Sequence, residues 1–223
     1  MRAAPVALAA WLLPTLAVVI VYLVSSSRGQ VPTCFPFLEG CTSISGAARR
    51  DPSIHIFRAI MLPTATIMAA YWLLARDWLA GLGDTGRARD VMATLGLIGA
   101  LFMILYIVFL GTDGRVYDLL RRYGVTVYFA FTALAQLLLT SRLQRLPAEA
   151  RRRVGPGVIQ AKIVFGVLML SLGLANIPAS NFFPELPVDN MIAWNFALLM
   201  KGYFGLTALS WRAIDYRIVT RAD

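Results

Sequence analysis

Long apolar stretches, each of about 20 residues, alternate with short polar segments along almost the whole chain. A helix needs about 20 apolar residues to cross the hydrocarbon core of a bilayer, where lipid offers its backbone no hydrogen-bond partner. The pattern therefore predicts an all-α membrane protein, a bundle of six transmembrane helices that forms a single domain over residues 1–223. The predicted spans are residues 5–24, 55–75, 91–111, 123–140, 158–177 and 189–211.

Composition and charge agree with this interpretation. The chain is 58% hydrophobic and only 15% charged, and its mean hydropathy is +0.67, which is typical of membrane proteins. Its net charge of +9 does not indicate a nucleic-acid partner, because the cations follow the predicted topology. With the N-terminus in the cytoplasm, the inner segments hold twelve arginines and the outer segments seven. The positive-inside rule thus predicts that both termini are cytoplasmic. The arginine-rich composition favours a bacterial inner membrane, with a eukaryotic endomembrane as the alternative.

The first predicted span and the connection after it can each be interpreted in two ways. Arg2 precedes an apolar run that is longer than the core of a signal peptide, so we interpret this run as an uncleaved anchor. Residues 25–54 form the longest predicted outer connection, and long loops are often functional. Cys34 and Cys41, the only cysteines, both lie in it. An oxidising compartment would permit one disulfide between them, and two unpaired thiols are the alternative.

Polar residues inside a predicted span are costly and are therefore functional candidates. Lys201 lies near the middle of the last span, and Asn195 precedes it on the same helix. The lysine needs a carboxylate, carbonyl or water partner, unless its long side chain snorkels to the interface. Gly96 and Gly99 are typical of close helix packing, as are Gly166 and Gly173.

Several residues that could bind a ligand or carry out a reaction lie at the outer end of the second predicted span. His55 and Arg58 lie three residues apart, and Ser43, Ser45 and Asp51 precede them. A Ser-His-Asp relay could be drawn from these residues, but a hydrogen-bonded vestibule is the interpretation that we favour. There Arg58 could grip a phosphate or a carboxylate through two hydrogen bonds. The single histidine argues against a metal or cofactor site, and we expect none.

A basic cluster lies in the fourth connection, where Arg151, Arg152 and Arg153 follow one another. Such a cluster could bind anionic lipid headgroups at about 1 kcal/mol per cation. Ordinary positive-inside orientation explains it equally well, and we favour that explanation.

A short motif resembles the Frag/DRAM/Sfk family of six-span membrane proteins. In that family a serine-rich outer loop leads into a proline, four intervening residues, an aromatic residue and an arginine at the second helix. The matching residues here are Ser43, Ser45, Pro52, Phe57 and Arg58. Relatives include a Golgi factor that is required for remodelling GPI-anchor lipids. The resemblance therefore implies a lipid-related role.

Two positions depart from the family pattern. Many relatives carry a histidine three residues before a glycine in the fourth helix, where this chain has Arg121 before Gly124. Many also carry an acidic residue before an aromatic one early in the last helix, where this chain has Asn195 before Phe196. Both changes remove a group that could exchange protons near neutral pH, so catalysis is not our leading expectation.

The leading hypothesis is an integral membrane protein that recognises a lipid headgroup at its outer face, with an anionic phospholipid or a glycolipid as partner. One alternative is a noncatalytic scaffold or regulator of a membrane-protein partner. A less favoured one is a transporter, in which Lys201 would matter. The residues proposed for the headgroup site are Ser43, Ser45, His55, Arg58, Asp113, Arg121 and Arg122.

Overall fold

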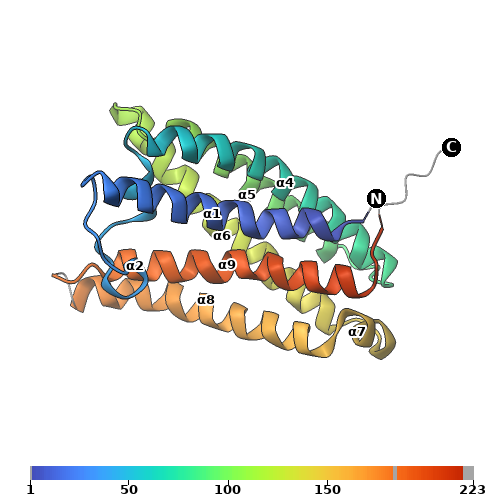
Figure 1. Cartoon of the computed structure of the whole chain (residues 1–223). Coiled ribbons are helices and arrows are strands. Elements are labelled where there is room, and N and C mark those ends of the chain that lie inside the picture. The colour runs from blue at the N-terminus through green and yellow to red at the C-terminus, as the bar shows by residue number, and fades with distance from the viewer. Residues whose placement is uncertain (1, 183–184, 218–223) are drawn as a thin grey trace.

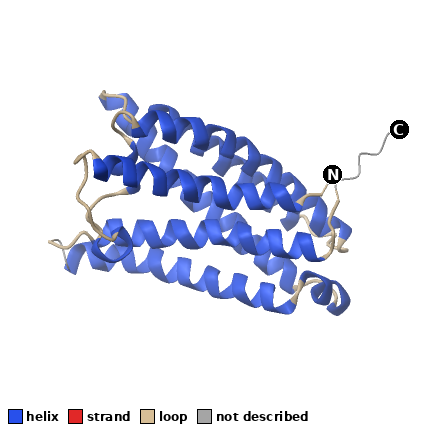
Figure 2. Cartoon of the chain, viewed as in Figure 1, coloured by secondary structure: helices blue, strands red, loops and turns tan. Residues whose placement is uncertain are grey.

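The computed structural model describes residues 2–182 and 185–217, and in these residues every regular element is a helix (Figures 1 and 2). This confirms the predicted all-α class. The helices are α1 (Ala4–Ser27), α2 (Pro36–Glu39), α3 (Ile44–Ala48), α4 (Ser53–Gly81), α5 (Ala88–Phe109), α6 (Arg115–Gln144), α7 (Ala148–Val154), α8 (Pro156–Phe182) and α9 (Val188–Ala213).

The six long helices form a closed ring in their sequence order. Each packs against its neighbours along the chain, and α9 closes the ring against α1 (Figure 1). Packing is closest between α5 and α6 and sparsest between α6 and α8. Aromatic side chains fill the interior, where the ring of Tyr71 lies 4.7 Å from that of Phe204 and 5.4 Å from that of Trp211. The loose α6–α8 seam is therefore where a lipid-facing groove can open.

Five of the helices are long and apolar enough to cross a membrane: α1, α4, α5, α6 and the 156–176 part of α8. They are compatible with a multi-pass membrane protein. Helix α9 is as long as the others but does not reach the same hydropathy, because it carries polar residues such as Asn195 and Lys201. It packs between α1 and α8, so protein rather than lipid covers much of its surface.

Helices extend beyond the apolar stretches that predicted them. Helix α6 begins at Arg115, eight residues before the predicted span, and α8 continues to Phe182 instead of ending at 177. The predicted fourth connection contains α7 and the start of α8. Hydropathy detects only the segment matched to hydrocarbon, whereas the backbone hydrogen bonds of a helix continue into polar sequence.

The long connection after α1 is ordered against α1 and α9. The predicted disulfide between Cys34 and Cys41 is confirmed. The Tyr22 hydroxyl donates to the Cys34 carbonyl at 2.6 Å, and the Trp194 indole N–H donates to the carbonyl of Thr42 at 2.8 Å. Asn195 donates to the carbonyl of Phe37 at 2.8 Å. These bonds hold α2 and α3 as a cap over one end of the bundle, which we call the α3 end.

Both ends of the described chain lie at the opposite end of the bundle, which we call the α7 end (Figure 1). The backbone N–H of Ala3 donates to the carbonyl of Tyr216 at 2.9 Å, and Arg2 forms an ion pair with Asp215. The Ser210 hydroxyl donates to the carbonyl of Val154 at the end of α7. The chain therefore makes an even number of passes along the bundle.

Candidate functional site

The two segments predicted to share a headgroup site both lie at the α3 end. The hydroxyls of Ser45 and Tyr106 are 2.8 Å apart, which joins α3 to the last turn of α5. Gly111, in the turn after α5, leaves no room for a side chain, because a Cβ atom there would lie 2.8 Å from the carbonyl oxygen of Arg49. The α3–α4 segment and the α5–α6 turn are thus packed together.

The guanidinium of Arg58 forms hydrogen bonds with the C-terminal end of α5. Its Nη2 donates to the carbonyls of Val108 and Leu110 at 3.0 and 2.8 Å, and its Nε donates to that of Ile107 at 3.4 Å. The last carbonyls of a helix lack partners within the helix and carry its partial negative charge. The guanidinium therefore caps α5, which positions α4 against it and leaves Arg58 poorly placed for a phosphate.

We expect Arg58→Met to destabilise the protein rather than to weaken lipid binding specifically. The variant keeps an apolar stem but removes a charged donor from carbonyls that then lack partners, at a cost of about 1.5–3 kcal/mol. Thermal unfolding of the detergent-solubilised protein should show a lower midpoint, with Arg122→Met as the control at an exposed arginine. Unchanged stability with lost lipid binding would instead favour the phosphate role that the sequence suggested.

The structure does not arrange the candidate Ser-His-Asp residues as a nucleophilic relay. The Ser43 hydroxyl caps α3 by accepting from the backbone N–H of Gly46 at 2.9 Å, and Ser45 is engaged by Tyr106. His55 lies 3.2 Å from the Asp51 carboxylate, and its side chain is 71% exposed. This pair lies at the surface, while both serine hydroxyls hold structural positions.

The other predicted headgroup residues lie at the exposed start of α6. Arg121 forms an ion pair with Asp118 at 2.9 Å, and Asp113 is exposed in the preceding turn. Arg122 and Asp118 both line a surface hollow of about 500 Å³. Arg115 also lines this hollow, whereas Arg58 and His55 do not, so the predicted residues do not converge on one cationic pocket.

The structure reveals a second buried lysine, which the sequence analysis did not single out. Lys162 of α8 donates to the Thr207 hydroxyl at 2.7 Å and to the carbonyl of Tyr203 at 3.3 Å. Its ammonium also lies 3.5 Å from the centre of the Tyr203 ring. Tyr71 of α4 reaches the same Thr207 hydroxyl at 2.8 Å. This polar cluster ties three helices together inside the bundle, and the i, i+4 spacing on α9 was its only sequence signal.

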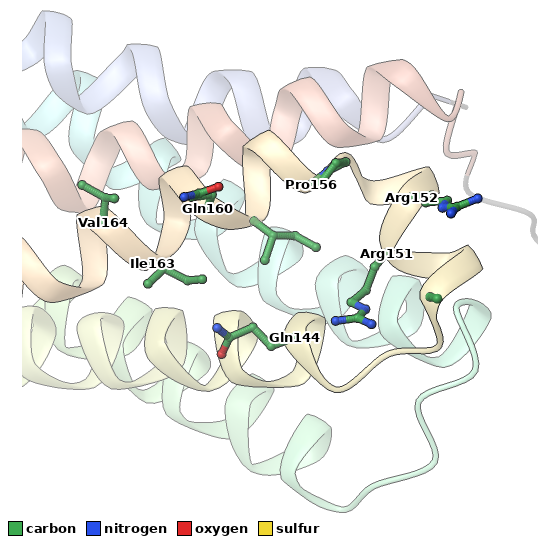
Figure 3. Close-up of a pocket in the computed structure, with 9 residues that line it drawn as sticks. Gln144, Arg151, Arg152, Pro156, Gln160, Ile163 and Val164 are labelled. Atoms are coloured by element: carbon green, nitrogen blue, oxygen red, sulfur yellow. The ribbon is translucent and has the colours of Figure 1, made fainter.

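A groove runs along the loose seam between α6 and α8 at the α7 end (Figure 3). It has a volume of about 590 Å³. Figure 3 shows the Arg151 side chain extending from α7 toward Gln144 of α6, whereas Arg152 extends toward the end of the bundle. The lining residues are Gln144, Ala148, Arg151, Arg152, Pro156, Ile159, Gln160, Ile163 and Val164.

The two ends of the groove differ in polarity. Arginines lie at the α7 end and Val164 at the other, and Gln144 and Gln160 lie between these ends together with aliphatic residues such as Ile163. Next to it, a hollow of about 180 Å³ shares Gln144 and Ile163 with the groove and reaches Leu170. The 14 residue-to-residue steps from Pro156 to Leu170 rise about 21 Å at 1.5 Å per step, enough to cover one leaflet of a hydrocarbon core about 30 Å thick.

Arg151 and Arg152 are available for a ligand. Neighbouring Arg153 forms an ion pair with Glu149 at 2.8 Å. Within residues 2–182 and 185–217, neither groove arginine is paired with a carboxylate. Two unpaired guanidinium groups at the polar end of an apolar groove match an anionic headgroup above an acyl chain.

No protein-family model, curated protein or solved structure matches this chain. The resemblance to the Frag/DRAM/Sfk family therefore remains a hypothesis that rests on its short motif.

Proposed function

We propose that the protein is a multi-pass membrane protein that binds one anionic phospholipid in the groove between α6 and α8. The observation that carries this proposal is the difference between the two ends of the groove, with unpaired arginines at one end, aliphatic side chains at the other and two amides between them. A phospholipid likewise has a phosphate at one end, an acyl chain at the other and ester carbonyls between them. Arg151 would contact the phosphate, and Gln144 and Gln160 would donate to the ester carbonyls.

The proposed topology places the groove in the cytoplasmic leaflet. In this topology α9 is the sixth span, and both termini lie in the cytoplasm with α7. The positive-inside rule supports this orientation, because the arginine-rich connections gather at the α7 end. The anionic lipids of the cytoplasmic leaflet would then be the ones that meet the groove. A bacterial inner membrane suits this proposal.

The proposal retains the lipid-related role expected from the sequence but moves the site to the other end of the bundle. At the α3 end, Arg58 caps α5, Arg121 is paired with Asp118, and the hollow that Arg115 and Arg122 line also contains that Asp118 carboxylate. At the α7 end, Arg151 and Arg152 are both free and next to an acyl-sized groove.

Arg151→Gln should weaken binding of phosphatidylglycerol by at least about tenfold, because it removes a charge-assisted hydrogen bond from the headgroup. Native mass spectrometry of the delipidated protein in detergent, titrated with this lipid, measures the effect. Binding of phosphatidylcholine should be weaker than that of phosphatidylglycerol in the wild type.

Arg153→Gln is the matched control, because it makes the same substitution at an ion-paired neighbour outside the groove lining. Val164→Trp should fill the apolar part of the groove and also reduce binding, whereas Leu168→Trp places the same ring at an exposed position of α8 outside the groove lining. Equal losses of phosphatidylglycerol binding in Arg151→Gln and Arg153→Gln would show that only the net charge of the protein matters. A stoichiometric protein partner without bound lipid would favour the scaffold alternative.

A further inference from the structure

A second, smaller hollow lies on the other side of the bundle, between α1 and α9 and under the cap formed by α2 and α3. Its volume is about 30 Å³. Phe37 of α2 and Ile44 of α3 close it from the α3 end. The remaining lining residues are Thr15, Val18, Val19, Trp194, Ala197, Leu198 and Lys201.

Lys201 lines this hollow as a buried cation without a partner. The residue is only 6% exposed. Across the part of the chain that the structure describes, its ammonium has neither a hydrogen-bond acceptor nor a carboxylate. Lys162, the other lysine, has both a hydroxyl and a carbonyl partner. An ammonium group has three donors, and burying it without compensation is costly. The ammonium is therefore free to pair with an anion or an acceptor from outside the chain.

The neighbouring polar groups do not supply that acceptor. The Thr15 hydroxyl donates to the carbonyl of Trp11 at 2.7 Å and forms no hydrogen bond with Lys201, and the Trp194 indole has only a donor, which bonds to the carbonyl of Thr42. The rest of the lining is apolar. One cation among hydrocarbon groups favours a ligand with a single negative charge and an apolar body.

The hollow faces the lipid through the α1–α9 seam. Val19 and Leu198, which line it, are 43% and 47% exposed on the two helices. Helix α9 begins at the α3 end, and helical side chains tilt toward the start of their helix. The ammonium of Lys201 is thereby shifted toward the leaflet at the α3 end, within reach of an amphiphile in that leaflet.

We propose that this hollow binds the carboxylate of a single-chain fatty acid. A space of 30 Å³ is about the volume that one water molecule occupies in the liquid, so it admits one carboxylate oxygen, with the rest of the carboxylate at its mouth, but not a glycerophosphate headgroup. The acyl chain lies outside the hollow, along Val19 and Leu198. Lys201 is the only residue that pairs with the carboxylate. The resulting ion pair has no net charge where it faces the lipid.

Oleate binding to the delipidated full-length protein in detergent tests this assignment. The wild type should bind one oleate, Lys201→Met should bind it at least about tenfold more weakly, and oleyl alcohol should bind the wild type at least about tenfold more weakly than oleate. Equal binding of oleate by the wild type and Lys201→Met, or of oleate and oleyl alcohol by the wild type, would overturn the proposal. So would complete displacement of oleate by chloride, which would identify the site as one for halide.

A steric variant keeps the proposal testable if Lys201→Met does not fold. Val19→Trp should block the mouth of the hollow and abolish oleate binding, whereas Leu16→Trp, at an exposed position of α1 outside the lining, should leave it unchanged. Equal oleate binding by these two tryptophan variants would count against the proposal. The fatty-acid proposal and the phospholipid proposal can be contradicted independently. Arg151→Gln should still bind oleate, and Lys201→Met should still bind phosphatidylglycerol.

Discussion

Asp84→Asn is expected to lower the free energy of unfolding by about 3–5 kcal/mol, the usual cost of breaking a buried ion pair by removing one partner. Asp84 lies in the connection between α4 and α5, and its side chain is 1% exposed. Arg142 of α6 donates to both of its carboxylate oxygens, with Nε 2.8 Å from Oδ2. The variant leaves the partly buried guanidinium of Arg142 beside a neutral amide.

The connection also depends on this carboxylate for its own shape. Asp84 Oδ1 accepts from the backbone N–H of Gly86 at 2.9 Å, and Arg89 donates to the Asp84 carbonyl at 2.8 Å. Asp84 therefore joins the α4–α5 turn to the last turn of α6. Thermal unfolding in detergent measures the loss, and Asp113→Asn, at an exposed turn, is the control that should leave the midpoint unchanged.

The same pair predicts how stability depends on pH. Hydrogen bonds from Arg142 hold the pKa of Asp84 below its ordinary value. A carboxylate with a lowered pKa in the folded state stabilises the protein fully above its ordinary pKa, and this contribution is lost as the pH falls through the lowered value. The wild type should therefore lose stability in acid more steeply than Asp84→Asn. Parallel acid profiles would contradict this assignment.

Gly124→Ala is the second variant for which we expect a large effect, a destabilisation of about 1–3 kcal/mol from overpacking. A Cβ atom at Gly124 would lie 2.8 Å from the backbone nitrogen and 3.0 Å from the Cα atom of Tyr106. These atoms belong to the α5 backbone, which can yield only if α5 and α6 separate. The variant should also disturb the bond between Tyr106 and Ser45 at the α3 end.

Gly173→Ala is the matched control, because a Cβ atom there would meet nothing within 4 Å. Alanine is the better helix former, so this variant should be neutral or more stable by up to about 1 kcal/mol. Thermal unfolding of both variants in the same detergent gives the comparison. Equal midpoints would show that α5 and α6 can move apart without cost.

Several features of the fold were predictable because they depend on local sequence. The disulfide between Cys34 and Cys41 was one, since two cysteines allow only one pairing. Gly96 and Gly99 were correctly interpreted as packing residues, and they face Trp72 and Thr132. Gly173 shows the limit of that rule, because it lies at an open surface.

The roles of charged residues were harder to predict, because they depend on neighbours that are distant in the sequence. Arg58 had the motif of a headgroup ligand, but the end of α5 lies about 50 residues further along the chain and takes up its donors. Lys162 was not identified from the sequence, because its partners lie about 40 residues further along the chain, on α9. The groove could not be predicted either, since it depends on how loosely α6 and α8 meet.

The sequence by itself determined the apolar helices, their order and the disulfide, because hydrogen bonds within each helix and the length of each apolar stretch are local properties. Only the tertiary structure decided which polar groups are satisfied and which remain available. In the folded chain, Arg58 is hydrogen-bonded to helix carbonyls and Asp84 to Arg142. Arg151 and Lys201 instead line a groove and a hollow. The physical reason is that the cost of a buried charge depends on the groups that surround it, and packing alone brings those groups together.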